Sequence, residues 1–427
     1  MKTFSVRSRA CAAGAGFLVA FWISAPFLSS FAGPVEHVVH VSVDGLRPDA
    51  ITALGPTNLP NFYRFRTEGA FTDNARTDYD YTVTLPNHTC QLTGRPVLGT
   101  NGHGWTGNTD PPAGVTLASN RGFYIAGVFD VAHDHGLRTA AYVSKSKFSL
   151  FDTSWDATNG APDLVGADDG RDKIDLYVYQ SNTGTLMNTL VANLSTQTFH
   201  YVFLHLADPD TTGHNYGWDP TPGSKYSNTI KTMDQRLGVL FDLVTTNSQL
   251  AGRTALVLTS DHGGYLNDHS NPSLREDYTI PFYVWGPGVM AGAPLYVLNT
   301  ASRLDPGTNR VPHTAPVQPI RNGEAGNLSL QLLGLPAVPG SVFNAAQDLA
   351  LMLPRPALDA SLTNGMLQLS FTTLPNVLYD LEAATTPTAA GWSNVVSNLA
   401  GTGEPIVWNC SIEGSGPQQF YRVRAHF

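Results

Sequence analysis

Three apolar runs of seven residues stand out along the chain, and an acid follows each of them. The runs with their acids are His37 to Val43 with Asp44, His200 to Leu206 with Asp208 and Asp210, and Thr254 to Ser260 with Asp261. Continuous runs rich in Val, Leu, Phe and Tyr are typical of strands buried on both faces of a parallel sheet. Because ligands of such sheets bind outside the carboxyl ends of the strands, the pattern predicts that these acids meet at one edge.

Amphipathic stretches alternate with strand-like runs from Glu36 to about Leu353. Their periodicity predicts helices over Ile125 to Leu137, Ile174 to Leu194 and Ser227 to Thr246, with a further strand over Thr139 to Val143. The two longer helices each precede an apolar strand. We therefore predict an α/β fold, with a mainly parallel sheet and helices on both faces.

The composition changes at Pro354 and Pro356, and no helical period follows. Short strand-like runs separated by Gly, Pro, Asn, Ser and Thr occupy the remainder, at Met366 to Phe371, Val377 to Glu382, Pro405 to Trp408 and Phe420 to Val423. We predict a principal domain over residues 33–353 and a small all-β module over residues 354–427. The module is too small for catalysis and suits binding or anchoring.

The first residues have a third pattern, in which basic residues precede an apolar stretch from Ala10 to Leu28 and small residues follow. This order is typical of a secretory signal peptide and predicts that residues 1–32 are removed after Ala32. An uncleaved membrane anchor is the alternative, since the stretch is nearly long enough to span a bilayer. Gly14 and Pro26 interrupt it, which favours cleavage, a periplasmic or extracellular mature chain, and no stable membrane span after cleavage.

Composition narrows the class of protein. The formal charge of −9 over 427 residues argues against nucleic-acid duplex binding, which requires a basic patch or stripe. Of the three cysteines, Cys11 lies in the signal segment, so Cys90 and Cys410 allow one bridge at most and exclude a disulfide framework. The sequence does not indicate the oligomeric state.

The acids at the strand ends are accompanied by histidines, as Asp210-Thr-Thr-Gly-His214 and as Asp261-His262. Mixed carboxylate and imidazole ligands are typical of zinc-like cations. A candidate nucleophile is Thr84, because a bound dication lowers the pKa of water from 15.7 to about 7 and acts on a neighbouring hydroxyl in the same way. Taken alone, Thr84 is better explained as an ordinary helix N-cap with Pro86 in the first turn.

In their order along the chain, these motifs resemble the alkaline phosphatase superfamily, and within it the nucleotide pyrophosphatase/phosphodiesterase-like branch. The motifs are Asp44, Thr84-Leu-Pro-Asn-His, Asp210-Thr-Thr-Gly-His214 and Ser260-Asp261-His262-Gly-Gly. The resemblance covers roughly residues 36 to 350 and not the C-terminal module. It implies an alkaline-phosphatase-like fold and hydrolysis of a small-molecule phosphate ester through a phosphothreonine intermediate at Thr84.

The resemblance also implies two divalent metal ions, which would be zinc. Asp44, Thr84, Asp261 and His262 would hold one ion, and Asp210, His214 and a third histidine would hold the other. A tight turn at Gly213 would present Asp210 and His214 to the same ion. For the third histidine we favour His269, on a short loop that can fold back over the metals, and His313 is the alternative.

Further residues have weaker signals. Asn108 matches the asparagine of the family that donates to a non-bridging phosphoryl oxygen, although it is also a plausible turn residue. Lys145 and Lys147 follow a strand and can meet phosphate charge, but we expect them to be solvated. Asp208 is expected to support a ligand rather than to be one. The strand histidines, expected in the core, are His37, His40 and His205.

The same motifs allow functions other than phosphodiester hydrolysis. Phosphomonoester hydrolysis would use the same machinery and is the main alternative. Sulfatases share the fold but need Cys or Ser where this chain has Thr84, so sulfatase activity is disfavoured. The related phosphoglycerate mutases are cytosolic, which the predicted signal peptide opposes. A secreted binding protein that retains metal ligands without turnover is the alternative from another class.

Overall fold

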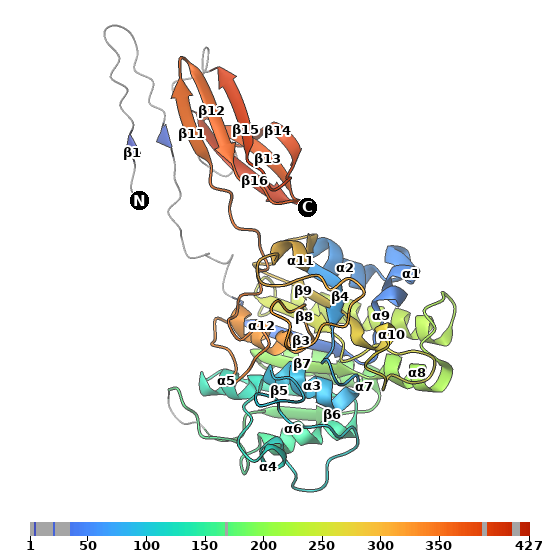
Figure 1. The fold of residues 1–427 in the computed structure, drawn as a ribbon. Helices are drawn as coiled ribbons and strands as arrows, with labels where there is room; N and C mark the ends of the chain where they lie inside the picture. The colour runs from blue at the N-terminus through green and yellow to red at the C-terminus, as the bar shows by residue number, and fades with distance from the viewer. Residues whose placement is uncertain (1–3, 6–19, 22–34, 167–169, 387–390, 412–418) are drawn as a thin grey trace. The chain divides into compact units, whose positions relative to one another are not determined.

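The computed structural model describes residues 4–5, 20–21, 35–166, 170–386, 391–411 and 419–427 (Figure 1). The described chain forms two compact units, a larger one within residues 31–351 and a smaller one that includes residues 352–427. The predicted signal segment lies outside the described residues, except for β1 (Phe4–Ser5) and β2 (Ala20–Phe21), which pair antiparallel. Among the helices that the structure describes, none has the length and apolar character needed to cross a membrane.

An eight-stranded sheet is the centre of the larger unit, in the order β10-β4-β9-β8-β3-β7-β5-β6. All pairs in this sheet are parallel except those of β9 with β4 and β8. The strands are β3 (His37–Val43), β4 (Ala70–Arg76), β5 (Thr139–Val143), β6 (Leu176–Tyr179), β7 (Tyr201–Leu206), β8 (Thr254–Thr259), β9 (Thr279–Trp285) and β10 (Ala293–Pro294). The three runs that end in acids are therefore the neighbouring strands β8, β3 and β7.

Helices cover both faces of this sheet (Figure 1). One face packs against α1 (Pro48–Asn58), α2 (Pro60–Glu68), α7 (Thr183–Leu194) and α9 (Lys225–Thr246), and the other against α3 (Thr84–Thr93), α5 (Val128–Asp134), α6 (Ser149–Ser154) and α12 (Glu324–Leu332). Alternate strand residues enter opposite cores, since Tyr142 of β5 packs in the first and Val143 in the second. This architecture confirms the predicted α/β fold class.

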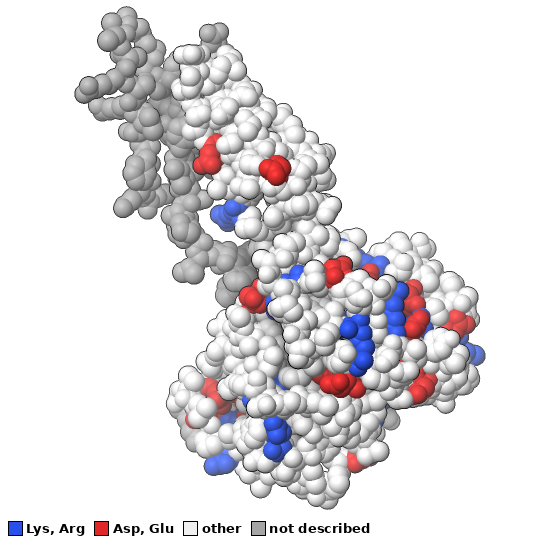
Figure 2. Space-filling model, viewed as in Figure 1, with Lys and Arg blue, Asp and Glu red and all other residues white. Residues whose placement is uncertain are grey.

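The remaining elements of the larger unit are short. They are α4 (Leu117–Arg121), the 3₁₀ turn η1 (Ser146–Phe148), α8 (Asp208–Tyr216), α10 (Arg275–Tyr278) and α11 (Leu295–Leu298). On the face seen in Figure 2, the basic and acidic side chains of this unit are sparse and interspersed, in keeping with a composition of 14% charged residues.

Two predicted helices differ from the structure. The predicted helix from Ile174 to Leu194 is wrong in its first part, because Leu176–Tyr179 pairs with β5 as an edge strand. Helix α7 begins only after Asn182, whose side chain caps it by accepting a hydrogen bond from Thr185 N. The helix predicted over Ile125 to Leu137 is shortened to α5. Gly127 immediately precedes the first residue of α5, and a Cβ at this glycine would be 2.5 Å from the Trp155 ring.

The smaller unit contains two three-stranded antiparallel sheets, which confirms a small all-β module at the C-terminus. One sheet has the order β11-β12-β15 and the other β14-β13-β16. Their strands are β11 (Asp359–Thr363), β12 (Met366–Phe371), β13 (Leu378–Ala384), β14 (Ser393–Ala400), β15 (Ile406–Ser411) and β16 (Phe420–His426). Leu367, Leu369 and Leu381 form the buried core of this module. The unpredicted strands β11 and β14 are edge strands whose residues are mostly exposed.

Candidate active site

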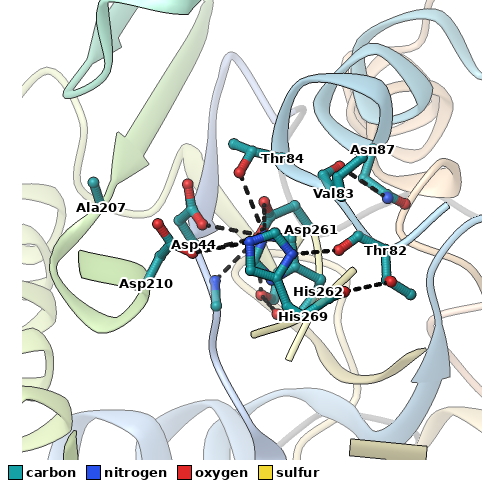
Figure 3. A network of polar contacts seen from close by, with 12 residues as sticks. Asp44, Thr82, Val83, Thr84, Asn87, Ala207, Asp210, Asp261, His262 and His269 are labelled. Carbon is teal, nitrogen blue, oxygen red and sulfur yellow. Dashed lines mark hydrogen bonds and ion pairs between the residues drawn. The ribbon is translucent and has the colours of Figure 1, made fainter. Parts of the chain in front are cut away.

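Four segments far apart in sequence meet at the carboxyl edge of the sheet (Figure 3). Asp44 directly follows β3, Asp210 lies in the first turn of α8 after β7, and Asp261 and His262 follow β8. Thr84 is the first residue of α3. All five side chains are buried. The structure thus brings together the strand-end acids that the apolar pattern placed at one edge.

His262 lies at the centre of this cluster. Its Nε2 is 3.1 Å from Asp261 Oδ2, 3.6 Å from Asp44 Oδ1, 3.9 Å from Asp210 Oδ1 and 3.4 Å from Thr84 Oγ1. Burial alone would lower the pKa of His262, but the surrounding carboxylates, chiefly Asp261, raise it to about 9. The raised pKa reflects how closely the carboxylates crowd around this ring.

His269 completes the second half of the cluster. Its Nε2 is 3.5 Å from Asp210 Oδ1 and 3.2 Å from the Nε2 of the exposed His214. His214 Nε2 is in turn 3.4 Å from Asp210 Oδ1. His313 is elsewhere, with its Nε2 2.9 Å from Asp78 Oδ2. Of the two candidates for the third histidine, the structure places His269 beside Asp210 and His214.

The expected tight turn between Asp210 and His214 is wrong. Both residues lie on α8, four positions apart, so that one helical turn brings them to the same side. Gly213 has a different purpose, since a Cβ at this position would lie 2.2 Å from the indole of Trp218. The glycine lets the helix lie directly against that ring.

The unsatisfied polar atoms of the cluster show that it fits divalent cations. Asp44 Oδ1, Asp210 Oδ1 and Asp261 Oδ2 are buried and have no hydrogen-bond partner among the described residues. Two sets of potential ligand atoms converge there, one from Asp44, Asp261 and His262 and one from Asp210, His262 and His269. Buried carboxylate oxygens without partners are costly unless a cation meets them.

The orientation of the histidines also favours cation binding. The Nδ1 atoms of His262, His269 and His214 lie 2.8, 2.6 and 3.1 Å from the carbonyl oxygens of Gly263, Thr82 and Asn267. Donation from Nδ1 to a carbonyl fixes the tautomer and leaves Nε2 as the ligand atom. All three Nε2 atoms therefore face the unsatisfied carboxylate oxygens, and carboxylate with imidazole is a ligand set typical of zinc.

Lys145 contradicts the expectation of a solvated side chain. Its Nζ is 2.7 Å from Asp44 Oδ2, 2.6 Å from Asp210 Oδ2 and 3.4 Å from Thr84 Oγ1. Burial would lower the pKa of Lys145, but these carboxylates raise it above its ordinary value. The residue follows β5, the neighbour of β7, so it reaches the same sheet edge as the acids.

Asn108 and Lys147 lie next to the start of α3. Asn108 Oδ1 accepts a hydrogen bond from Leu85 N at 2.9 Å, and Lys147 Nζ donates to the Asn108 carbonyl oxygen at 2.6 Å. Because the amide oxygen of Asn108 already has donors, its NH₂ group is what remains to serve a ligand near Thr84. Burial lowers the pKa of Lys147 from its ordinary value.

His205, which the sequence placed only in the core, contacts the candidate site. Its Nε2 donates to Asp44 Oδ2 at 2.9 Å, and its Nδ1 is 2.9 Å from Ser144 Oγ. It therefore orients a candidate metal ligand from the adjacent strand. The other strand histidines are packed as expected, with His37 bonded to Phe199 O and His40 to Tyr201 Oη. Asp208, expected to support the site, instead faces Arg236 at 3.5 Å.

Solved structures include two neighbours with a similar fold. Murine ectonucleotide pyrophosphatase/phosphodiesterase 5 is 16% identical, with a TM-score of 0.49 over 74% of this chain and 99% of that one. A protein of the alkaline phosphatase superfamily from Vibrio parahaemolyticus is 14% identical, with a TM-score of 0.46 over 81% of this chain and 78% of that one. At these values neither neighbour adds to the family assignment, which rests on sequence.

A curated relative matches a short part of the chain. GPI ethanolamine phosphate transferase 1 of Neurospora crassa is 40% identical over 88 residues, which is 20% of this chain and 8% of that protein. The sequence model of the type I phosphodiesterase/nucleotide pyrophosphatase family matches residues 38–276, more than half of the chain, and confirms the predicted family. This chain belongs to the type I phosphodiesterase/nucleotide pyrophosphatase family.

Proposed function

We propose that this protein is a metal-dependent hydrolase of small phosphate esters, most simply a phosphodiesterase, and that Thr84 is its nucleophile. The observation that carries the proposal is the position of Thr84 Oγ1, 3.4 Å from His262 Nε2, beside buried carboxylate oxygens that have no hydrogen-bond partner among the described residues. A hydroxyl in this setting is poised for nucleophilic catalysis once positive charge occupies the cluster.

We assign the cation ligands in two groups. Asp44, Thr84, Asp261 and His262 would hold one divalent ion, and Asp210, His214 and His269 the other, both zinc by the nature of their ligands. When bound, such a pair lowers the pKa of the threonine hydroxyl and stabilises the charge of an in-line displacement. The fit of these residues to cations is supported by the orientation of the three histidines.

The reaction then follows from the chain's own groups. The Thr84 hydroxyl gives its proton to solvent, its Oγ forms a bond to phosphorus as the bond to the leaving oxygen breaks, and the leaving oxygen takes a proton from solvent. The Asn108 NH₂ group donates a hydrogen bond to a non-bridging phosphoryl oxygen, and Lys145 and Lys147 contribute positive charge. Water then attacks the phosphorus and loses a proton to solvent as the bond to Thr84 Oγ breaks, so that the phosphate product leaves and Oγ regains a proton from solvent. His205 keeps Asp44 in place by donating to its Oδ2.

Hydrolysis of phosphomonoesters is the second candidate, and the two lysines favour it. Lys145 lies 3.4 Å from Thr84 Oγ1, and Lys147 bonds Asn108 at 2.6 Å. A monoester carries one more ionisable oxygen than a diester, so two ammonium groups near the nucleophile have more charge to meet there. The proposal of a diester substrate rests on the family, and the proposal of a monoester substrate rests on the positive charge of Lys145 and Lys147.

A pair of chromogenic substrates tests the proposal. We expect hydrolysis of bis-p-nitrophenyl phosphate, p-nitrophenyl phosphate or both with zinc, and loss of activity with chelator. Thr84→Ala should abolish turnover while retaining bound metal, whereas Thr84→Ser should retain part of it. Inactivity on both substrates in a zinc-loaded protein would contradict the enzyme proposal and leave a metal-retaining binding protein.

Two expectations from outside the site complete the proposal. The basic and apolar segment before Ala32 supports export to the periplasm or the extracellular space. The C-terminal β module, with its small core, suits binding or anchoring rather than chemistry. Mass analysis of the mature secreted chain would test the first expectation by locating its N-terminus.

A further inference from the structure

The ammonium group of Lys145 joins the two sets of candidate cation ligands. Its Nζ is 2.7 Å from Asp44 Oδ2 and 2.6 Å from Asp210 Oδ2, and these two carboxylates belong to different sets. The lysine side chain is 17% exposed, and the carboxylates are 0% and 6% exposed. A positive charge is thus held between the two halves of the site by two short ion pairs.

These ion pairs use only one oxygen of each carboxylate. Lys145 meets the Oδ2 atoms of Asp44 and Asp210, while the Oδ1 atoms of both residues have no hydrogen-bond partner in the described part of the chain. The Oδ1 atoms are those that face the candidate ligand histidines, with His262 Nε2 3.6 Å from Asp44 Oδ1, whereas His205 bonds Asp44 Oδ2. The site therefore separates the oxygens occupied by the ammonium from those left for another cation.

The charge balance explains why a lysine is needed. Asp44, Asp210 and Asp261 crowd three carboxylates into a buried space, where unpaired like charges strongly destabilise the folded chain. The imidazoles that face them are His262, His269, His214 and His205. Of the positively charged side chains described near the cluster, Lys145 contacts two of the three acids directly, whereas Lys147 bonds the oxygens of Asn108.

We propose that Lys145 is the internal counter-cation of the metal-free site and that its charge opposes the binding of divalent cations by Asp44 and Asp210. It stabilises the folded chain before metal arrives and weakens metal binding, because its charge opposes that of the incoming ions. Metal loading then weakens its two ion pairs and frees the ammonium for the Thr84 side of the site, 3.4 Å away. This inference rests on the proposed cation sites.

The alternative role for Lys145 is a clamp that holds both carboxylates in the geometry for metal. The two roles predict opposite signs. Removing a clamp loosens the ligands and weakens metal binding, whereas removing a counter-cation leaves more negative charge and strengthens it. Zinc affinity therefore distinguishes the two roles without any measurement of turnover.

The experiment compares Lys145→Met with the wild-type full chain, each stripped of metal by chelator. We expect the melting temperature of metal-free Lys145→Met to fall, and its zinc dissociation constant, measured against a chromophoric chelator, to decrease on the order of tenfold. Lys147→Met is the matched control, since its Nζ contacts Asn108, and should change affinity less. Lys145→Arg, which keeps the charge, should remain close to the wild type.

Unchanged or weaker zinc binding by Lys145→Met would overturn the inference. If Lys145→Met folds only with zinc, the release of zinc from the loaded protein into excess chelator replaces the equilibrium measurement. Slower release than from the wild type supports the counter-cation role, and equal or faster release contradicts it. Failure of the wild type itself to bind zinc would instead contradict the proposed function.

Discussion

The imidazole rings of His262 and His269 are stacked, with centroids 3.6 Å apart and planes 8° from parallel. His262 lies beside Asp261 at the end of β8, and His269 lies beside Asp210 and His214. The Nδ1 atoms of the two rings bond the carbonyl oxygens of Gly263 and Thr82, and both Nε2 atoms face Asp210 Oδ1, at 3.9 and 3.5 Å. The stack connects the two halves of the candidate metal centre.

Replacing His269 should remove a metal ion, whereas replacing His313 should not. His269→Ala deletes an Nε2 that lies 3.5 Å from Asp210 Oδ1, while His313 is bonded to Asp78. We expect zinc content, measured by elemental mass spectrometry after dialysis, to fall by about one ion per chain in His269→Ala and to stay constant in His313→Ala. The reverse result would assign the third ligand to His313.

Gly213→Ala should destabilise the protein because the helix that carries Asp210 and His214 touches Trp218. An added Cβ would lie 2.2 Å from the indole, so the helix or the ring must move. We expect the free energy of unfolding to fall by about 1–3 kcal/mol in denaturant titrations. Asn215→Ala, at an exposed position of the same helix, is the control. Equal stability of the two variants would show that the contact is not tight.

Asn108→Ala should lower turnover while leaving the metals bound. The variant removes the NH₂ group proposed to donate to a phosphoryl oxygen beside Thr84, whereas none of the candidate ligand atoms belongs to Asn108. We expect kcat to fall by about 10²–10³-fold with unchanged zinc content. Asn120→Ala, in which the exposed side chain bonds the Gly104 carbonyl oxygen, is the matched control. A loss no greater than that of the control would remove Asn108 from the mechanism.

The stability of the larger unit should depend on pH through Asp130. Burial raises the pKa of Asp130 to about 6, although hydrogen bonds from the Tyr124 hydroxyl and Gly127 N oppose the shift. The pKa of Asp130 in the folded chain lies above the ordinary value of 3.8, so the folded state favours the protonated carboxyl. The contribution of this carboxyl to stability is complete below about pH 4 and is lost as the pH rises through about 6. Denaturant unfolding between these pH values should show a shallower decline for Asp130→Asn than for the wild type.

A control separates this effect from general titration of the chain. Asp242 is exposed on α9, and Asp242→Asn removes one carboxylate without touching the buried one. If Asp242→Asn flattened the pH dependence as much as Asp130→Asn, the buried carboxyl would not be responsible.

The central strands and the residues that follow them were predictable from the sequence. A strand buried on both faces must be apolar throughout, so β3, β7 and β8 appear as continuous runs, and the polar residue that ends each run marks the sheet edge. Asp44 and Asp261 were found in this way. The strand β6 was not, because its short run merges with the apolar positions of α7 and only Gln180, Ser181 and the Asn182 cap separate them.

Lys145 and His205 could not be placed from their own runs, because their contacts depend on strand order. Lys145 reaches the acids because β5 lies next to β7, and His205 reaches Asp44 because β7 lies next to β3. Strand order is set by pairing between distant segments, which no local pattern contains. The available signal for Lys145 was its position two residues after β5, which put it near the sheet edge but did not show which acids it would meet.

Anomalous scattering from crystals of the zinc-loaded protein, collected on both sides of the zinc edge, tests the central claim most directly. We predict two zinc peaks, one contacting Asp44 Oδ1, Asp261 Oδ2, His262 Nε2 and the Thr84 oxygen, and the other contacting Asp210, His214 and His269. The absence of zinc from this cluster, or peaks bound only at other residues, would contradict the account.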